Sequence, residues 1–273
     1  MTIQTALQQG QKLLEDAGIL APRLTAEVLL AHAIGCPRSW LYAHSGEQLK
    51  ELWWIHYGRY LHQRLSGMPT QYITGTQEFF GRDFRVTPGV LIPRPETEHL
   101  IEAALKYCAA TALDIGTGSG AIAVTLALET ETRVTATEIS SSAIRVAQSN
   151  SRRLAALVDF VQCDLGSALR DQSFDLVVSN PPYVPEGDRA TLQREVRDHE
   201  PALALFAGAD GLDIYRRLIP EAARLLKPGG RLILELGHNS LEGVRQMLEG
   251  WGDVEVIADL AHIPRVVGAD KRT

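Results

Sequence analysis

Apolar residues recur every three to four positions through residues 1–65, and this spacing is typical of amphipathic helices. The repeat is clear at Ala6, Leu13 and Leu14, within a stretch rich in strong helix formers. A longer helix is expected over residues 46–65, where aromatic residues share the helical spacing. No strand-like alternation interrupts this region. The pattern therefore predicts a small all-helical domain.

The pattern changes near residue 77. Two short strand-like runs, residues 78–80 and 83–86, flank Gly81, which favours a β-hairpin with a glycine turn. The run that follows, residues 88–96, contains too many prolines for a helix. This segment reads as a joint between two larger units.

From residue 111 onward, short apolar runs alternate with helix-like stretches. Five runs are strand-like, namely residues 111–115, 133–138, 157–162, 174–179 and 231–236. Four stretches between or after them are helix-like, namely residues 121–129, 141–154, 212–226 and 241–249. Strands that are apolar on both faces and spaced by helices predict a parallel sheet in an α/β domain. Two further runs, residues 254–258 and 265–268, predict a hairpin at the sheet edge.

These patterns divide the chain into three expected parts. Residues 1–75 form a helical domain, residues 76–108 a hairpin and linker, and residues 109–273 the α/β domain. A chain of 273 residues with 45% hydrophobic content holds enough apolar material for this arrangement.

Composition narrows the classes of protein further. No apolar run approaches the roughly 20 residues that a membrane span requires, and the first residues lack the layout of a signal peptide. Three scattered cysteines are too few for a disulfide framework or a zinc site, so we expect a reduced, cytoplasmic setting and no metal. The net charge of −6 argues against a free-standing nucleic-acid binder, because such a protein normally carries a basic surplus. Basic and acidic residues are nearly balanced in residues 1–90, so the acidic surplus lies after them.

The first strand of the α/β region is joined to the next helix by a glycine-rich turn, Gly116-Thr117-Gly118-Ser119-Gly120. Glycines allow a ligand to approach the backbone, and the helix N-terminus behind them offers free N–H groups. Glu138 ends the next strand, where a carboxylate can accept both hydroxyls of a ribose. With Ala121 the turn also satisfies a dinucleotide fingerprint. Asp114 favours S-adenosylmethionine instead, because it would repel a pyrophosphate and suit the ammonium group of a methionine moiety.

The strand at residues 174–179 runs directly into Asn180-Pro181-Pro182-Tyr183. Ligands bind outside the carboxyl ends of parallel strands, so we expect this tetrad beside the glycine turn. Its prolines remove backbone donors and stiffen the loop, which leaves the Asn180 side-chain oxygen and the Pro181 carbonyl as acceptors. Two acceptors that grip an NH₂ group favour its pyramidal form as a methyl group arrives, and Tyr183 can shield the developing charge. The tetrad indicates methyl transfer to an amino group, although an isolated Asn-Pro-Pro would be read as a structural turn.

With both motifs placed, the chain resembles the HemK (PrmC) family of protein-glutamine methyltransferases, which modify peptide-chain release factors. The resemblance covers nearly the whole chain. It includes Gly67-x-Pro69-x-Gln71-Tyr72-Ile73-x-Gly75, Glu78-Phe79-x-Gly81-x-x-Phe84-x-Val86 and Pro88-Gly89-Val90-Leu91-Ile92-Pro93-Arg94-Pro95-Glu96-Thr97-Glu98. DNA adenine-N6 methyltransferases share the tetrad, whereas the Pro-Arg-Pro-Glu-Thr-Glu stretch is far more specific to this family.

The resemblance implies a small helical domain that helps to recognise a protein substrate, followed by a Rossmann-like class I methyltransferase domain with a mostly parallel seven-stranded sheet. It implies that S-adenosylmethionine is held by Asp114, Gly116, Thr117, Gly118, Ser119, Gly120, Glu138, Asp164, Leu165 and Asn180. The substrate glutamine would lie against Asn180, Pro181, Pro182 and Tyr183, with Asn180, Pro181 and Tyr183 as the catalytic residues. Many members have Asp in place of Glu138 and an aromatic residue within residues 164–166, which this chain lacks.

The expected reaction is methyl transfer to the glutamine amide of a Gly-Gly-Gln motif in a class I release factor, with S-adenosylhomocysteine as the product. We expect a cytoplasmic monomer with no metal, no membrane contact and no stable nucleic-acid partner. A glutamine methyltransferase that acts on a ribosomal protein would share these motifs. A DNA adenine methyltransferase would need a basic cleft, which the acidic surplus disfavours. A nicotinamide dehydrogenase and a non-catalytic module that keeps the pocket remain as alternatives from other classes.

A few further residues have two interpretations each. The aromatic residues within 53–60 are expected to be core rather than a docking surface. His199 is expected to be a structural or surface residue rather than a general base. Glu235 ends a strand at the edge where the site is expected, so it can support the site indirectly. Arg94 and Glu96 either order a loop over the cofactor or cap the next helix.

Overall fold

The computed structural model describes residues 1–272 and divides them into two compact units. The helical unit consists of Met1–Gly75 together with the short segment Gln193–His199. The rest of the described chain forms the sheet unit, which begins at Thr76. Nothing in the sequence pattern singled out Gln193–His199 as part of the first unit.

The helical unit contains α1 (Ile3–Asp16), α2 (Pro22–Ile34), α3 (Arg38–Ala43), α4 (Glu51–Leu65), α5 (Thr70–Thr74) and α9 (Arg194–His199). The expected long helix begins at Glu51 rather than at residue 46, because Lys50 is extended. Tyr57 is fully buried in the core of this unit, and Trp54 and Tyr60 pack against that core. Three of the four aromatic residues predicted to be core therefore lie in it or against it, whereas Trp53 is half-buried and its ring centroid lies 4.4 Å from Nζ of Lys50. Glu195 of α9 forms an ion pair with the buried Arg64 of α4.

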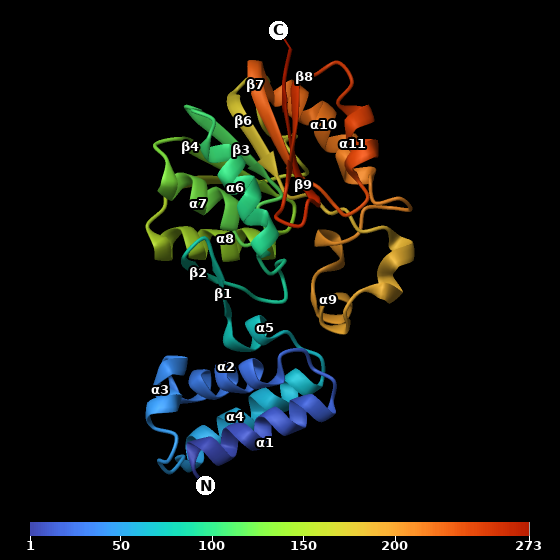
Figure 1. Ribbon diagram of the computed structural model, residues 1–273. Coiled ribbons are helices and arrows are strands. Elements are labelled where there is room, and N and C mark those ends of the chain that lie inside the picture. Colours follow the sequence, from blue (N-terminus) through green and yellow to red (C-terminus); the bar gives the residue numbers. More distant parts are fainter. Residues whose placement is uncertain (273) are drawn as a thin grey trace. The chain divides into compact units, whose positions relative to one another are not determined.

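The sheet unit is built on seven strands in the order β5-β4-β3-β6-β7-β9-β8 (Figure 1). They are β3 (Thr111–Ile115), β4 (Arg133–Glu138), β5 (Val158–Gln162), β6 (Phe174–Ser179), β7 (Leu226–Glu235), β8 (Gly252–Ala258) and β9 (Pro264–Asp270). Five neighbouring strands, β5, β4, β3, β6 and β7, run parallel to one another. β9 runs antiparallel to both β7 and β8. The predicted mostly parallel sheet with a hairpin at one edge is confirmed.

The helices of this unit are α6 (Glu98–Leu105), α7 (Ala121–Glu129), α8 (Ser141–Leu154), α10 (Asp213–Leu225) and α11 (Leu241–Met247). Three short 3₁₀ turns accompany them, η1 (Pro95–Thr97), η2 (Glu186–Thr191) and η3 (Ala202–Ala204). Most lie close to the ranges expected from the pattern. β7 starts at Leu226, five residues before the apolar run that predicted it, because it pairs there with Phe174.

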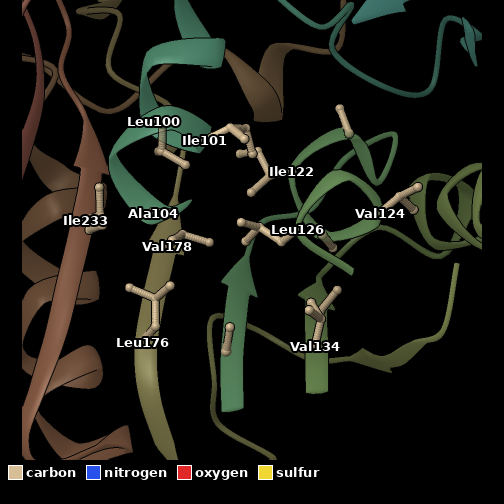
Figure 2. Packing of buried hydrophobic residues seen from close by; sticks show 14 of the residues in the cluster. Leu100, Ile101, Ala104, Ile122, Val124, Leu126, Val134, Leu176, Val178 and Ile233 are labelled. Atoms are coloured by element: carbon tan, nitrogen blue, oxygen red, sulfur yellow. The ribbon is translucent and has the colours of Figure 1, made fainter. Parts of the chain in front are cut away.

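Both faces of the sheet are covered by helices. Figure 2 shows Leu100 and Ile101 of α6 and Ile122 of α7 on one face, packed toward Leu176 and Val178 of β6. The intervening Val177 belongs to the opposite core, which α10 and α11 complete. Successive side chains of a strand point to opposite faces, so a central strand covered on both sides carries apolar residues at consecutive positions, as at Leu176–Val178.

The hairpin predicted near Gly81 is present as β1 (Thr76–Phe79) and β2 (Arg82–Arg85), which pair antiparallel. Phe79 and Phe84 are buried, with ring centroids 6.0 Å apart in an edge-on arrangement. The hairpin therefore has its own apolar anchor in the sheet unit. Among residues 1–272, no helix combines the length and the apolar character needed to cross a bilayer.

Candidate active site

A cavity lies where β3, β4 and β6 end, and its empty volume, including the part open to solvent, is about 990 Å³. β3 lies between β4 and β6 in the sheet, so the chain moves outward in opposite directions from this point. The carboxyl ends of strands beside such a switch point are where open α/β sheets bind ligands. Both motifs from the sequence contribute to the wall, through Gly116, Gly118 and Asn180.

The glycine turn keeps its shape through backbone geometry. Gly116, Gly118 and Gly120 have φ values of 76°, 56° and 83°, a region that side chains other than glycine rarely adopt. A Cβ atom on Gly116 or Gly118 would meet nothing within 4 Å, so the space in front of the turn is open. A Cβ on Gly120 would lie 3.1 Å from the Cβ of Ala147, which explains glycine there by close packing of α7 on α8.

Glu138 connects the end of β4 to the glycine turn. Its Oε2 accepts a hydrogen bond from the Gly118 N–H at 3.0 Å, and its Oε1 accepts one from the Ser140 N–H at 2.9 Å. The half-buried carboxylate also lines the cavity. The structure thus places the predicted ribose-binding group directly beside the predicted glycine turn.

Asp114 is completely buried beneath the turn. Its Oδ2 accepts a hydrogen bond from the Ala123 N–H at 3.2 Å, in the first turn of α7. Burial raises the pKa of the Asp114 carboxyl to about 7, and the nearby charge of Glu138 adds to that rise. Among residues 1–272, Oδ1 has no hydrogen-bond partner. This side chain supports the turn from below, and its contact with a methionine moiety stays a prediction.

The predicted Thr117 and Ser119 are buried within the turn rather than presented to the cavity. The N–H groups of Gly116 and Thr117 both donate to the Thr137 carbonyl, at 2.9 and 3.0 Å. These bonds attach the turn to the neighbouring strand β4. A role of Thr117 and Ser119 toward a ligand would therefore pass through the backbone.

The tetrad follows β6 and presents one end of the Asn180 amide to the cavity. Asn180 Nδ2 donates a hydrogen bond to Oγ1 of Thr97 at 3.0 Å. This bond fixes the orientation of the amide and leaves its oxygen, Oδ1, to accept from a ligand. Pro181 and Pro182 also line the cavity. The loop therefore carries the acceptor group that the sequence predicted.

Tyr183 is directed away from this acceptor. A Cβ on Gly237 would lie 2.8 Å from its ring, so the ring packs closely on that glycine. The Tyr183 hydroxyl lies 3.5 Å from Oε1 of Glu235. Burial and the charge of Glu235 raise the pKa of the Tyr183 hydroxyl well above its usual value. In this arrangement Tyr183 supports the loop, and the direct contact expected with a substrate stays a prediction.

Asp164 and Leu165 also line the cavity, and the contact with a cofactor that the resemblance implies for them stays a prediction. Leu165 has a φ of 50°, which is unusual for a residue with a side chain. The Asp164 carboxylate forms an ion pair with Arg217 of α10, which also lines the cavity together with Ile214 and Leu218. Sequence reasoning missed this contribution of α10, because only the packing of that helix brings it to the site.

Two further segments that sequence reasoning missed flank the cavity, residues 89–91 and residues 201–204. The buried carboxylate of Glu200 joins them. It accepts hydrogen bonds from the Ile92 N–H at 3.3 Å and from Nη2 of Arg94 at 2.5 Å. Of the two interpretations of Arg94, the structure supports the one in which it orders a loop beside the cavity.

Asn150 also contributes to the site, and sequence reasoning missed it. It lies fully buried on α8 and exchanges hydrogen bonds with the backbone N–H and carbonyl of Arg85, at 2.8 and 3.0 Å. Its Nδ2 also donates to the Ser119 carbonyl at 2.8 Å. One side chain thus joins the hairpin to the glycine turn. A buried asparagine in an apolar helix face was the available signal for such a role.

His199 belongs to the helical unit, where its Nε2 would lie 3.2 Å from a Cβ on Gly67. This placement agrees with the expectation of a structural residue. Within residues 1–272, no group of three or more His, Cys, Asp or Glu side chains is arranged to hold a metal ion.

Comparison with known families finds two matches. Residues 5–75 match the PrmC N-terminal domain, and residues 95–203 match the methyltransferase small domain. The 16S rRNA methyltransferase of T. thermophilus, solved in complex with AdoMet and guanosine, superposes with a TM-score of 0.56 at 23% identity, over 72% of this chain and 50% of that one. This likeness concerns the fold alone.

Two curated proteins are similar over their whole length. The release factor glutamine methyltransferase of Koribacter versatilis is 45% identical over 279 residues, which is 100% of both chains. The release factor glutamine methyltransferase of Geobacter sulfurreducens is 44% identical over 98% of this chain and 96% of its own.

Proposed function

Because the chain belongs to the family of release factor glutamine methyltransferases, we propose that it methylates the glutamine of a Gly-Gly-Gln motif in class I peptide-chain release factors. The methyl group comes from S-adenosylmethionine and goes to the side-chain amide nitrogen. The observation that carries the proposal is the Asn180 amide, whose nitrogen is held by Thr97 and whose oxygen is left to accept at the cavity.

The residues present fit S-adenosylmethionine. The open space in front of Gly116 and Gly118 can take the methionine part, since no Cβ atom stands in the way. The Glu138 carboxylate at the cavity wall suits the two ribose hydroxyls. S-adenosylmethionine, when bound, supplies a methyl group activated by the positive sulfonium. Asp164, Leu165 and α10 line the cavity, and there they would flank the adenine.

The acceptors of the tetrad perform the task that this reaction poses. A glutamine amide nitrogen is a poor nucleophile because its lone pair is delocalised into the carbonyl group. Asn180 Oδ1 and the Pro181 carbonyl would accept the two N–H bonds of that amide and hold its nitrogen toward the methyl group. The new N–C bond forms as the C–S bond breaks and the sulfur keeps the electron pair. One amide proton then leaves to water, so no general base is required.

The two units would divide the work. We propose that the helical unit helps to recognise the release factor and that the sheet unit, with the hairpin as its first element, performs the transfer. A net charge of −6 agrees with a protein substrate rather than a stable nucleic-acid partner. The proposed enzyme is a monomer and acts in the cytoplasm, where translation termination takes place.

The test is incubation of the purified protein with labelled S-adenosylmethionine and a class I release factor. A second reaction contains the release factor with its Gly-Gly-Gln changed to Gly-Gly-Ala. Label on the first and none on the second is expected. Label on neither, with cofactor binding measured by calorimetry in the same preparation, would overturn the proposed substrate and direct the search to ribosomal proteins.

A further inference from the structure

The carboxyl group of Glu235 is buried next to the tetrad and has no role in the mechanism above. Glu235 is 2% exposed at the end of β7, beside the end of β6, where Ser179 pairs with Leu234. Among residues 1–272, no hydrogen-bond partner reaches its Oε2. A buried carboxyl with an unpaired oxygen is costly, and such a group calls for an explanation.

Thr97 forms a direct hydrogen bond with Asn180. The Thr97 side chain is buried, and its Oγ1 accepts the hydrogen bond from Asn180 Nδ2. A hydroxyl that accepts still has one hydrogen to donate. The Glu235 carboxyl is near enough for the Thr97 hydroxyl to oppose the rise of its pKa, which burial brings to about 7 and the charge of Glu96 increases. Both residues therefore contact the tetrad, Thr97 through Asn180 and Glu235 through the Tyr183 hydroxyl.

We propose that Thr97 and Glu235 are positioning residues that keep the oxygen of the Asn180 amide directed at the substrate glutamine. Glu235 takes the hydrogen of the Thr97 hydroxyl, so the Thr97 oxygen is presented as an acceptor to Asn180 Nδ2. The Tyr183 hydroxyl, 3.5 Å from Oε1, approaches the same carboxyl from the tetrad itself. This inference rests on the proposed function, because it assigns the residues that orient its acceptor.

The physical need for such residues follows from the symmetry of an asparagine amide. Its oxygen and NH₂ group are similar in size, so a rotation of 180° exchanges an acceptor for a donor at the same place. With the NH₂ group directed at the cavity, two donors would face each other when the glutamine amide binds, and neither would be satisfied. A buried acceptor at Thr97 makes one of the two orientations strongly preferred.

The experiment compares Thr97→Val with Thr97→Ser in the release factor methylation assay. Valine keeps the shape and removes the hydroxyl, so we expect kcat to fall at least tenfold, with the dissociation constant of S-adenosylmethionine changed less than threefold. Serine keeps the hydroxyl and is expected to restore kcat to within about threefold of the wild type. Thr125→Val is the matched control. Thr125 lies on α7 and is buried like Thr97, but its hydroxyl has no hydrogen-bond partner in residues 1–272. That variant should keep its kcat.

Glu235→Leu and the double variant Thr97→Val/Glu235→Leu test whether the two residues act together. If they do, the double variant loses no more kcat than the worse single variant. Losses that multiply, or an active Thr97→Val, would overturn the inference while the wild-type activity leaves the proposed function standing. A wild type that binds S-adenosylmethionine and labels no release factor would overturn the proposed function and this inference with it.

Discussion

The glycine turn and the Asn-Pro-Pro-Tyr loop follow neighbouring strands of one sheet, yet they are held by opposite means. β3 and β6 pair side by side, with Asp114 opposite Val178, so the two loops meet at one edge. The turn is held by backbone N–H groups that donate to Thr137 and Glu138. The tetrad is held by the side-chain amide of Asn180, which donates to Thr97. Its two prolines have no backbone N–H to donate and stiffen the loop through their fixed φ angles.

This difference assigns each loop its chemistry. Positive φ values and the absence of Cβ atoms make the glycine turn a surface that a ligand can approach closely. Removal of donors makes the tetrad a surface of acceptors, which is what an amide NH₂ group requires. In the proposed mechanism, one edge of the sheet therefore offers a place for the methyl donor and, next to it, a place for the amide that receives the methyl group.

Asn180→Ala breaks the acceptor half of the comparison and should have the largest effect. We expect kcat to fall about 100-fold or more, because one positioned hydrogen-bonding group at a reacting centre is commonly worth that much. The dissociation constant of S-adenosylmethionine should change much less, since the glycine turn and Glu138 are untouched. Steady-state kinetics and calorimetry on the same preparation check both values. Turnover close to that of the wild type would contradict the acceptor mechanism.

Gly120→Ala tests the other loop of the comparison, the glycine turn, by placing a Cβ atom where α7 packs closely on α8. The variant combines a φ of 83° with a Cβ atom 3.1 Å from Ala147, and we expect a loss of about 2–3 kcal/mol in the free energy of unfolding. Gly250→Ala is the matched control, with a φ of 95° and nothing within 4 Å of the new Cβ, and should lose about 1 kcal/mol.

Gly118→Ala sharpens the same test, because its Cβ also meets nothing within 4 Å while Gly118 lines the cavity. It should resemble Gly250→Ala in chemical denaturation and bind S-adenosylmethionine more weakly. Equal losses of stability in all three variants would show that close packing on α8 is not what requires glycine at position 120.

Asp114→Asn examines the support beneath the turn, and its effect on stability depends on pH. The folded protein raises the pKa of the Asp114 carboxyl to about 7 from an ordinary value of 3.8. The carboxyl therefore contributes its full stability below about pH 4 and loses it as the pH rises through 7. We expect the stability advantage of the wild type over Asp114→Asn to shrink across that range, by about 1.4 kcal/mol for each unit by which folding raises the pKa of the carboxyl. Denaturation of both proteins at several pH values, without cofactor, measures it. A difference that stays constant with pH would contradict the assignment.

Much of the fold could be predicted because its signals are local. Short runs such as residues 174–179 contain consecutive apolar residues, here Leu176–Val178, which is typical of a strand covered on both faces. Gly81 marked the hairpin and the closing pair of strands was visible as two apolar runs. The segment Gln193–His199 could not be assigned to the helical unit, because an ion pair such as Arg64–Glu195 leaves no periodic trace.

The residues of the candidate site likewise fall into those that the sequence predicted and those that it did not. Gly116, Glu138 and Asn180 stand at strand ends, and the rule that parallel strands end at a common edge was enough to bring them together. Glu200, Asn150 and Arg217 escaped notice, since each acts across more than 30 residues of chain through one or two hydrogen bonds or an ion pair. Tyr183 was identified as a residue of the site, but its ring direction depends on Gly237, far away in the chain.

Residue order alone was sufficient for the α/β class, the location of both loops and the chemistry that each can support, because hydrophobic period, glycine and proline act on the nearest few residues. Tertiary structure decided that Thr97 binds the nitrogen of the Asn180 amide, and it buried Glu235 at the end of the neighbouring strand β7. An amide has no preferred orientation of its own, and a carboxyl has no fixed pKa. Both are set by the groups that folding brings into contact with them.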